Sequence, residues 1–238
     1  MSSTETWGTL YGVSVGPGDP DLMTVKGLKT LQQSPVIAFP AGINGKPGVA
    51  ETIISSCLSP QQQRLALQFP YTQDETLLTQ AWQQAARKVI DPLQQGLNVA
   101  FACEGDVNFY GTFTYLAQTL QQFHPTVKIQ TIPGVCSPLA AVASLGVPLT
   151  VRDQRLLIVP ALYNIEQLQT ALTQADVLVL MKMSSVYPQI WEILNQLNLL
   201  EQASVVEWAT LPQQKIYHGL SDRPQLQLSY FSLMIITG

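Results

Sequence analysis

Charged residues are scarce in this chain. Asp, Glu, Lys and Arg make up only 12% of its 238 residues, the formal net charge is −4, and no run of basic residues occurs. Proteins that bind nucleic acid usually carry a basic patch or stripe, so nucleic acid is not expected as a partner. Disorder is also disfavoured, because 46% of the residues are hydrophobic and the chain is long enough to bury a sizeable core.

Cysteine and histidine are rare as well. Cys57, Cys103 and Cys136 are scattered, no C-x-x-C pair occurs, and His124 and His218 lie far apart. The spacing typical of zinc ligands is absent, so no metal site is expected. Isolated cysteines in odd number are typical of the reducing cytoplasm, where disulfides are rare.

Long apolar segments are also missing from the sequence. No hydrophobic run approaches the roughly 20 residues that a membrane-spanning helix needs. Residues 1–8, MSSTETWG, lack the charged and apolar regions of a secretory signal. The sequence therefore predicts a cytoplasmic protein without a membrane partner.

The most informative segment that is present is LYGVSVGPGDPD, residues 10–21. An alternating apolar run ends abruptly in the turn 16–19, GPGD, and apolar residues then recur at helical spacing, which predicts a strand, a tight turn and a helix. The turn lacks both the third glycine of G-x-G-x-x-G and the G-K-[ST] of a phosphate loop. Because Asp19 places a carboxylate here, a ligand with a positive centre suits the turn better than a phosphate. An ordinary strand–helix turn is the alternative.

Strands and helices alternate along the rest of the chain. In the first half the sequence predicts strands at 36–39, 64–67 and 98–102, and helices at 24–33, 49–58 and 111–122. A further helix, the third in chain order, is expected between the last two of these strands, ending at Gly96. Thr72-Gln73-Asp74-Glu75 is typical of a capping box that opens the third helix. In the second half, strands are expected at 127–132, 156–159, 177–181, 203–208, 215–219 and 230–236, with helices at 137–146, 164–173 and 187–197. Thr24, Ser137 and Asn164 are the expected helix caps.

This pattern predicts an α/β fold made of two domains, 1–125 and 126–238, with His124-Pro125-Thr126 as the linker. The second domain ends rich in strands, so a mixed sheet is expected there.

Four short turn segments each follow a predicted strand. They are GPGD at 16–19, EGD at 104–106, PGVCS at 133–137 and MKM at 181–183. Ligands of open α/β sheets bind outside the carboxyl ends of the strands. Any one of these turns is explained as an ordinary connection after a strand. The four together predict a single ligand-binding cleft between the two domains.

These turns carry a resemblance to a known family. With GPGD, EGD and PGV-x-S in this order, the chain resembles the tetrapyrrole (corrin and porphyrin) methylases over nearly its whole length. The segments FACEGDVNFYGTFTYL, IPGVCSPLAAVASLGVPL, VLMKM and VEWATLPQQKIY extend the match. The GPGDP-x-L-x-T opening, the GD-x-x-x-Y-x-T-F-x-Y-L helix, IVPALY and the closing YFS are most similar to the members that methylate carbon 20 of precorrin-2 or cobalt-factor II.

The resemblance implies a two-domain α/β fold of the class III S-adenosylmethionine-dependent methyltransferases, with the cofactor in the cleft between the domains. By position it implies these cofactor contacts: Pro17, Gly105, Asp106, Val107 and Tyr110 from the first domain, and Cys136, Ser137, Met181 and Ala209 from the second. The chain departs from the family pattern at two places. Val107-Asn108 stands where proline often follows GD, and Cys136 stands where Ser or Thr is common, so only a backbone contact is expected at 136.

The activity implied is transfer of a methyl group to carbon 20 of a tetrapyrrole in cobalamin biosynthesis. Such a displacement needs aligned reactants, not a nucleophile from the protein, and Cys136 has no neighbouring histidine or cation to activate its thiol. Asp106, Glu104 and Tyr110 are the candidates for a base that removes the proton from carbon 20, with loop hydrogen bonding and cofactor positioning as the alternative.

The same resemblance implies two partners, a tetrapyrrole substrate and a second copy of the chain. The substrate is a polycarboxylate, and the basic residues near predicted loop ends are Lys26, Lys46, Arg152, Arg155 and Lys182. Ordinary surface charge is the alternative for each of them. Members of the family are usually homodimers, so a homodimer is expected.

Two other functions stay open at this point. The chain is a sister methylase if its substrate pocket selects another ligand, as in uroporphyrinogen III methyltransferase, another precorrin methylase or diphthine synthase, because the loop motifs are shared by all of these. A cofactor-binding module without turnover is the other alternative. Four intact strand-end loops and a complete second domain weigh against it.

Overall fold

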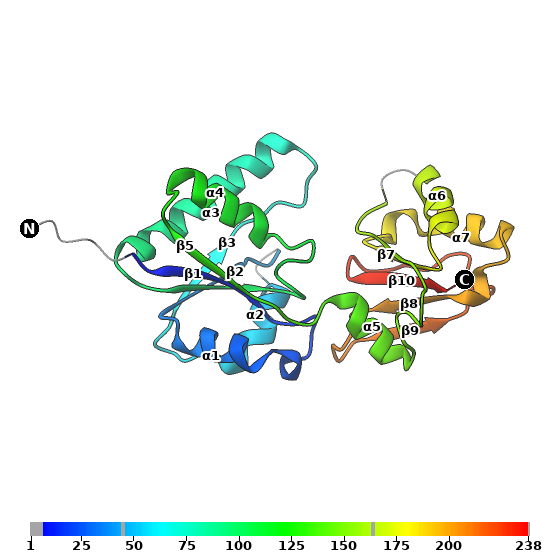
Figure 1. The fold of residues 1–238 in the computed structure, drawn as a ribbon, viewed down its shortest axis with the longest axis horizontal. Coiled ribbons are helices and arrows are strands. Elements are labelled where there is room, and N and C mark those ends of the chain that lie inside the picture. Colours follow the sequence, from blue (N-terminus) through cyan, green and yellow to red (C-terminus); the bar gives the residue numbers. More distant parts are fainter. Residues whose placement is uncertain (1–6, 44–45, 163–164, 238) are drawn as a thin grey trace, which may run out of the picture. The chain divides into compact units, whose positions relative to one another are not determined.

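The computed structural model describes residues 7–43, 46–162 and 165–237, and the chain divides into two compact units, Met1–Cys136 and Ser137–Gly238 (Figure 1). Both units are of the α/β type, as predicted. Across the three described ranges, every helix falls short of the length and apolar character that a membrane crossing requires.

The boundary between the units differs from the predicted one at 125 and 126. Strand β5 (Lys128–Ile132) was expected to open the second domain, but it pairs in parallel with β1 (Thr9–Ser14), with Leu10 opposite Ile129. The first unit therefore extends to Cys136. Periodicity predicts a strand correctly but does not say which neighbour it pairs with.

The first unit is built on a parallel sheet with the strand order β3-β2-β4-β1-β5. Its remaining strands are β2 (Val36–Pro40), β3 (Gln63–Leu67) and β4 (Val99–Cys103). The central strand β4 is buried along its whole length, as expected for a parallel strand with both faces covered.

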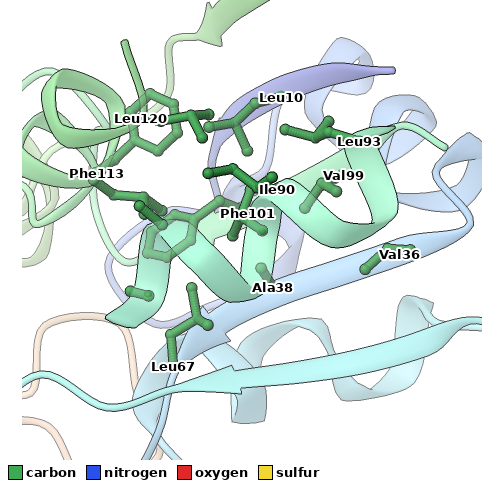
Figure 2. Close-up of a cluster of buried hydrophobic side chains, with 14 of the residues drawn as sticks. Leu10, Val36, Ala38, Leu67, Ile90, Leu93, Val99, Phe101, Phe113 and Leu120 are labelled. Carbon is green, nitrogen blue, oxygen red and sulfur yellow. The ribbon is translucent and has the colours of Figure 1, made fainter. Parts of the chain in front are cut away.

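Helices cover both faces of this sheet (Figure 1). On one face, α3 (Glu75–Gln94) and α4 (Phe113–Phe123) pack on a core that includes Leu10, Phe101 and Leu93 (Figure 2). On the other face, α1 (Val25–Gln33) and α2 (Val49–Ile54) pack on a second core around Val13, Ile37 and Ala100. Two short 3-10 turns, Pro20–Leu22 and Ser55–Cys57, complete this unit.

The ends of α3 follow local capping chemistry. The predicted capping box has Thr72 as its cap, but the helix begins two residues later, because Asp74 is the cap and its Oδ1 accepts the N–H groups of Thr76 and Leu77 at 2.8 and 3.1 Å. Thr72 Oγ instead accepts the N–H of Asp74. Gly96 ends the helix as predicted, with φ at 77°. Helix α1 has the predicted cap, Thr24, whose hydroxyl accepts the N–H of Gly27.

The second unit contains the predicted mixed sheet, with the order β6-β7-β10-β8-β9. Strands β6 and β7 are parallel, whereas β10 is antiparallel to both β7 and β8. The strand bounds are β6 (Leu156–Val159), β7 (Val177–Met181), β8 (Ala203–Glu207), β9 (Lys215–His218) and β10 (Ser232–Thr237).

The helices of this unit are α5 (Ser137–Leu145), α6 (Glu166–Gln174) and α7 (Tyr187–Gln196), with 3-10 turns at Ser184–Val186 and Leu200–Gln202. Residues of α6 and α7 share one core with Leu178, Leu180, Val205 and Met234 of the sheet. The predicted cap of α6, Asn164, lies outside the described residues.

Candidate functional site

The loops that follow β1, β4 and β5 lie at one edge of the first sheet, because all its strands are parallel. Strand β1 leads into α1 on one face of the sheet, and its neighbour β4 leads into α4 on the opposite face. Adjacent strands whose connections diverge in this way form a topological switch point, where open α/β sheets bind their ligands.

The two glycine turns at this switch point are joined directly. Gly16 N donates to Gly105 O at 3.2 Å, and Gly105 N donates to Gly16 O at 2.8 Å. Both glycines are left-handed, with φ at 79° and 69°, a conformation that other residues adopt only at a cost. A Cβ added to Gly105 would meet no other atom within 4 Å, so the backbone here faces open space.

Asp106 links three loops through its carboxylate. Oδ2 accepts the N–H of Gly134 at 2.7 Å and the hydroxyl of Ser14 at 3.3 Å, and Oδ1 accepts the N–H of Asn108 at 2.9 Å. The hydroxyl of Ser14 in turn accepts the N–H of Val107 at 2.8 Å. Residues far apart in sequence are therefore held at fixed positions by one charged group.

The PGVCS loop packs closely against the end of β1. A Cβ on Gly134 would lie 2.5 Å from Cβ of Ser14, so glycine is needed at this position for steric reasons. At this point of close approach, the backbone N–H of Gly134 donates to Asp106 Oδ2. In the first loop, Asp19 caps the 3-10 turn by accepting the N–H of Asp21.

The EGD loop continues to Tyr110, whose backbone is left-handed at φ 52°. Its side chain is 52% exposed and packs edge-on against Phe109 at 4.8 Å between ring centroids. A non-glycine residue held in this region stores strain, which is common at ligand-binding loops. Val107, by contrast, is fully buried and anchors the loop to the core.

The thiol at the end of β4 is structural. Cys103 is 4% exposed, and burial, with a smaller contribution from Glu104, raises the pKa of its thiol to about 12. A thiol that stays protonated is a poor nucleophile.

In the second unit, the carboxyl ends of β7 and β8 lie at the same edge of the sheet, because both strands are antiparallel to β10. Met181 ends β7 and is half-buried, and Lys182 follows it with a left-handed φ of 52°. After β8, Trp208 and Thr210 are left-handed too, at 52° and 68°, and Ala209 between them is buried.

Gln214 supports the loop that follows β8. Its side-chain oxygen accepts the N–H of Thr210 at 2.6 Å and the hydroxyl of Ser144 at 2.9 Å. The strained turn around Ala209 is thus connected to α5 by one amide.

The structure places the predicted cofactor residues in two groups. Pro17, Gly105, Asp106, Val107 and Tyr110 lie in the joined loops of the first unit, and Met181 and Ala209 lie at one sheet edge of the second. Cys136 and Ser137 flank the boundary between the units. Of the predicted cations, Arg155 is paired with Asp176 at 3.2 Å, and its backbone N–H, followed by its guanidinium, lowers the pKa of that carboxyl.

Several residues that hold these loops in place are not predicted from the sequence. Ser14 carries no motif, and its only signal is a hydroxyl at the end of an otherwise apolar strand. Glu207, Trp208 and Phe231 lie inside segments that the resemblance includes, VEWATLPQQKIY and YFS, but nothing in those segments shows that they meet.

The chain is similar to proteins of known family over most of its length. Residues 9–224 match the family model described as Tetrapyrrole (Corrin/Porphyrin) Methylases. A cobalt-precorrin-2 C(20)-methyltransferase of Salmonella typhimurium is 31% identical over 96% of both chains, and a precorrin-2 C(20)-methyltransferase of a Sinorhizobium species is 30% identical over 97% of this chain and 96% of that relative.

A cobalamin biosynthesis protein CobIJ of Mycobacterium tuberculosis is 32% identical over 97% of this chain, which spans only 46% of that longer relative. Among solved structures, a cobalt precorrin-4 methyltransferase matches with a TM-score of 0.74 over 96% of this chain and 94% of its own, at 24% identity. A uroporphyrin-III C-methyl transferase from Thermus thermophilus, complexed with S-adenyl homocysteine, matches with a TM-score of 0.69 over 97% and 92%, at 19% identity. These two structures share the fold.

Proposed function

The chain belongs to the tetrapyrrole (corrin/porphyrin) methylase family, and from this membership we propose that it transfers a methyl group from S-adenosylmethionine to carbon 20 of precorrin-2 or cobalt-factor II in cobalamin biosynthesis. The observation that carries the proposal is the similarity, nearly from end to end, to two C(20)-methyltransferases. That similarity extends over 96–97% of this chain and 96% of each relative, so it includes both units.

The loops of the first unit suit a sulfonium cofactor. The ends of β1 and β4 carry the carboxylates of Asp19, Glu104 and Asp106, and a sulfonium is a cation. The backbone at Gly105 faces open space, which permits close approach of a ligand. We assign cofactor contacts to Pro17, Gly105, Val107, Tyr110 and Cys136 in this unit, and to Ser137, Met181 and Ala209 in the second unit.

In this proposal the protein accelerates the reaction by holding the methyl donor and the tetrapyrrole in line. S-adenosylmethionine supplies an electrophilic methyl group, and the electron-rich meso carbon 20 of the tetrapyrrole is the nucleophile. The joined Gly16 and Gly105 turns fix one wall of the site before any ligand arrives, so little ordering is left for the reaction itself. No cysteine is required as a nucleophile, which agrees with the buried, protonated thiol of Cys103.

Among the three candidates for a proton acceptor, Asp106 is the least suitable. Its two carboxylate oxygens already accept three hydrogen bonds from the loops. We therefore propose that Asp106 positions the loops and that the proton of carbon 20 passes to Glu104 or Tyr110, of which Tyr110 is the more exposed.

Two properties are proposed on the basis of family membership. We propose that the protein is a homodimer and that it works in the cytoplasm. Light scattering on the purified protein tests the first, and fractionation of the source cells tests the second.

A transfer assay tests the proposed function. Purified protein is given methyl-labelled S-adenosylmethionine with precorrin-2 or with cobalt-factor II, and products are weighed by mass spectrometry. We expect one added methyl group on at least one of the two substrates, and the preferred substrate assigns the metal-free or the cobalt branch. Transfer to uroporphyrinogen III alone would instead identify a sister methylase, and binding of the cofactor without transfer to any tetrapyrrole would identify a binding module.

A further inference from the structure

A cation and three aromatic rings lie together at the carboxyl edge of the second sheet. Lys182 follows β7, Trp208 follows β8, and Tyr230 and Phe231 immediately precede β10, which pairs with both of these strands. We call the three aromatic residues Trp208, Tyr230 and Phe231 the aromatic shelf.

The rings of the shelf pack on one another. The centroids of Trp208 and Phe231 are 4.5 Å apart with their planes at 37°, and those of Tyr230 and Phe231 are 5.3 Å apart with their planes at 88°. Trp208 and Phe231 are half-buried, whereas Tyr230 is 43% exposed. The Nζ atom of Lys182 lies 5.6 Å from the centroid of the Tyr230 ring, within the range of a cation–π contact.

Hydrogen bonds from β8 hold the shelf in place. Glu207 is only 3% exposed, and its Oε1 atom accepts the N–H of Ser229 at 2.7 Å. The N–H of Trp208 donates to the carbonyl of Phe231 at 2.9 Å. The hydroxyl of Ser232 donates to the carbonyl of Ser229 at 2.8 Å, which closes the turn that carries Tyr230.

Backbone strain is concentrated at the same place. Lys182 and Trp208 both have φ at 52°, in the left-handed region. Such residues cost on the order of 1–3 kcal/mol each and persist where the surrounding structure holds them, most often at ligand sites. Here Met183, fully buried directly after Lys182, anchors the strained turn.

The charge of Lys182 is not neutralised by an acidic partner in the described part of the chain, where the ion pairs are Arg155 with Asp176 and Arg223 with Asp222. The face of a tyrosine ring orients an ammonium group without removing its charge, so the remaining N–H donors can still bind an anion. This distinguishes Lys182 from Arg155, a predicted cation that directly precedes β6 and is already paired with Asp176.

We propose that Lys182, oriented by Tyr230, binds a peripheral carboxylate of the tetrapyrrole substrate and thereby sets how the macrocycle lies at the site. This inference rests on the proposed function. Glu207 is a positioning residue in this arrangement, because it acts through the turn that holds Tyr230. The other carboxylate available in the reaction is that of the cofactor's methionine, and the experiment separates the two.

The test compares Lys182→Gln, Lys182→Arg, Tyr230→Leu and Tyr230→Phe with wild type, with Lys128→Gln as the control. Lys128 is an exposed lysine of β5 in the first unit, so its replacement removes the same charge elsewhere. KM and kcat are measured for each reactant separately, and binding of cobalt-factor II is followed by quenching of tryptophan fluorescence, which does not depend on turnover.

We expect Lys182→Gln to raise both the KM and the Kd for the tetrapyrrole by about ten- to fifty-fold, the loss expected for one charge-assisted hydrogen bond. The KM for S-adenosylmethionine should stay within about twofold. Lys182→Arg and Tyr230→Phe should stay near wild type, because they keep the charge and the ring, whereas Tyr230→Leu should raise the tetrapyrrole KM several-fold.

The inference is overturned if Lys182→Gln binds the tetrapyrrole like Lys128→Gln, or if only the KM for the cofactor rises. Its failure differs from failure of the proposed function. A wild-type protein that binds cobalt-factor II through Lys182 without transferring a methyl group would refute the methylation and keep this contact. A wild-type protein that binds no tetrapyrrole would refute both.

Discussion

The backbones of Gly16 and Gly105 are joined by two reciprocal hydrogen bonds at 3.2 and 2.8 Å, so the turns that follow β1 and β4 behave as one element. The two turns are separated by most of the first unit in sequence. Both positions favour glycine because each backbone is left-handed, a conformation that other residues adopt only at a cost. Their connection places the EGD loop at a fixed position relative to the GPGD loop.

Replacing Gly105 with alanine should impair cofactor binding beyond its effect on stability. The added Cβ is strained at φ 69° and projects into the open space beside the paired turns. Gly146 offers a matched control, because its φ is 71° and an added Cβ would also meet no atom within 4 Å. We expect both variants to lose about 1–2 kcal/mol of unfolding free energy, while only Gly105→Ala weakens S-adenosylhomocysteine binding, by about tenfold or more in calorimetry. Equal affinity in the two variants would contradict the assignment.

Removing the carboxylate of Asp106 should destabilise the first unit. Three donors, on Ser14, Asn108 and Gly134, lose their acceptor in Asp106→Ala, and a buried or half-buried donor left unsatisfied costs about 1–3 kcal/mol. We expect urea denaturation to show a loss of about 2–4 kcal/mol, with a smaller loss in Asp106→Asn. Asp91→Ala, which removes an exposed carboxylate of α3, should stay within about 0.5 kcal/mol of wild type. If Asp106→Asn kept full stability and cofactor affinity but lost turnover, Asp106 would be a base and not a positioning residue.

Alkaline pH should destabilise the protein through Cys103. Burial raises the pKa of this thiol from 9.0 to about 12. Below pH 9 the thiol is protonated in both states and contributes nothing. Between pH 9 and about 12 only the unfolded state ionises, so the free energy of unfolding falls, by at most about 1.4 kcal/mol per pH unit. Cys103→Ala should flatten this dependence in denaturation series under reducing conditions, and Cys57→Ala should not. An unchanged slope in Cys103→Ala would show that other groups cause the loss.

Tyr187 should contribute to stability through its hydroxyl. The phenol is in the core of the second unit and donates to the carbonyl of Arg223 at 2.8 Å, and burial raises its pKa to about 12. Tyr187→Phe keeps the ring but leaves that carbonyl without its partner, so we expect a loss of about 1–2 kcal/mol in chemical denaturation. Tyr115→Phe, at a 48% exposed ring stacked on Trp82, is the control and should be nearly neutral. A neutral Tyr187→Phe would mean that water replaces the bond at no cost.

The sequence carried enough local information to predict most elements and the position of the loops. Thr24 and Gly96 bound their helices as predicted, because capping depends on near neighbours in the chain. The start of α3 was misplaced, since Thr72 and Asp74 both have cap chemistry and sequence alone does not rank them.

Features that depend on pairing between distant segments were not accessible in this way. The pairing of β5 with β1 moved the boundary between the units, and nothing in the periodicity of residues 128–132 indicates that neighbour. The contact of Ser14 with Asp106 and that of Trp208 with Phe231 likewise arise only when separate strands meet at one edge of a sheet.

The most direct test of the account is the position of the transferred methyl group. The enzyme is given precorrin-2 or cobalt-factor II with S-adenosylmethionine that carries a carbon-13 methyl, and the product is assigned by nuclear magnetic resonance. The account predicts a single labelled methyl bonded to the meso carbon 20. A labelled methyl on any other ring carbon, with none at carbon 20, would contradict it.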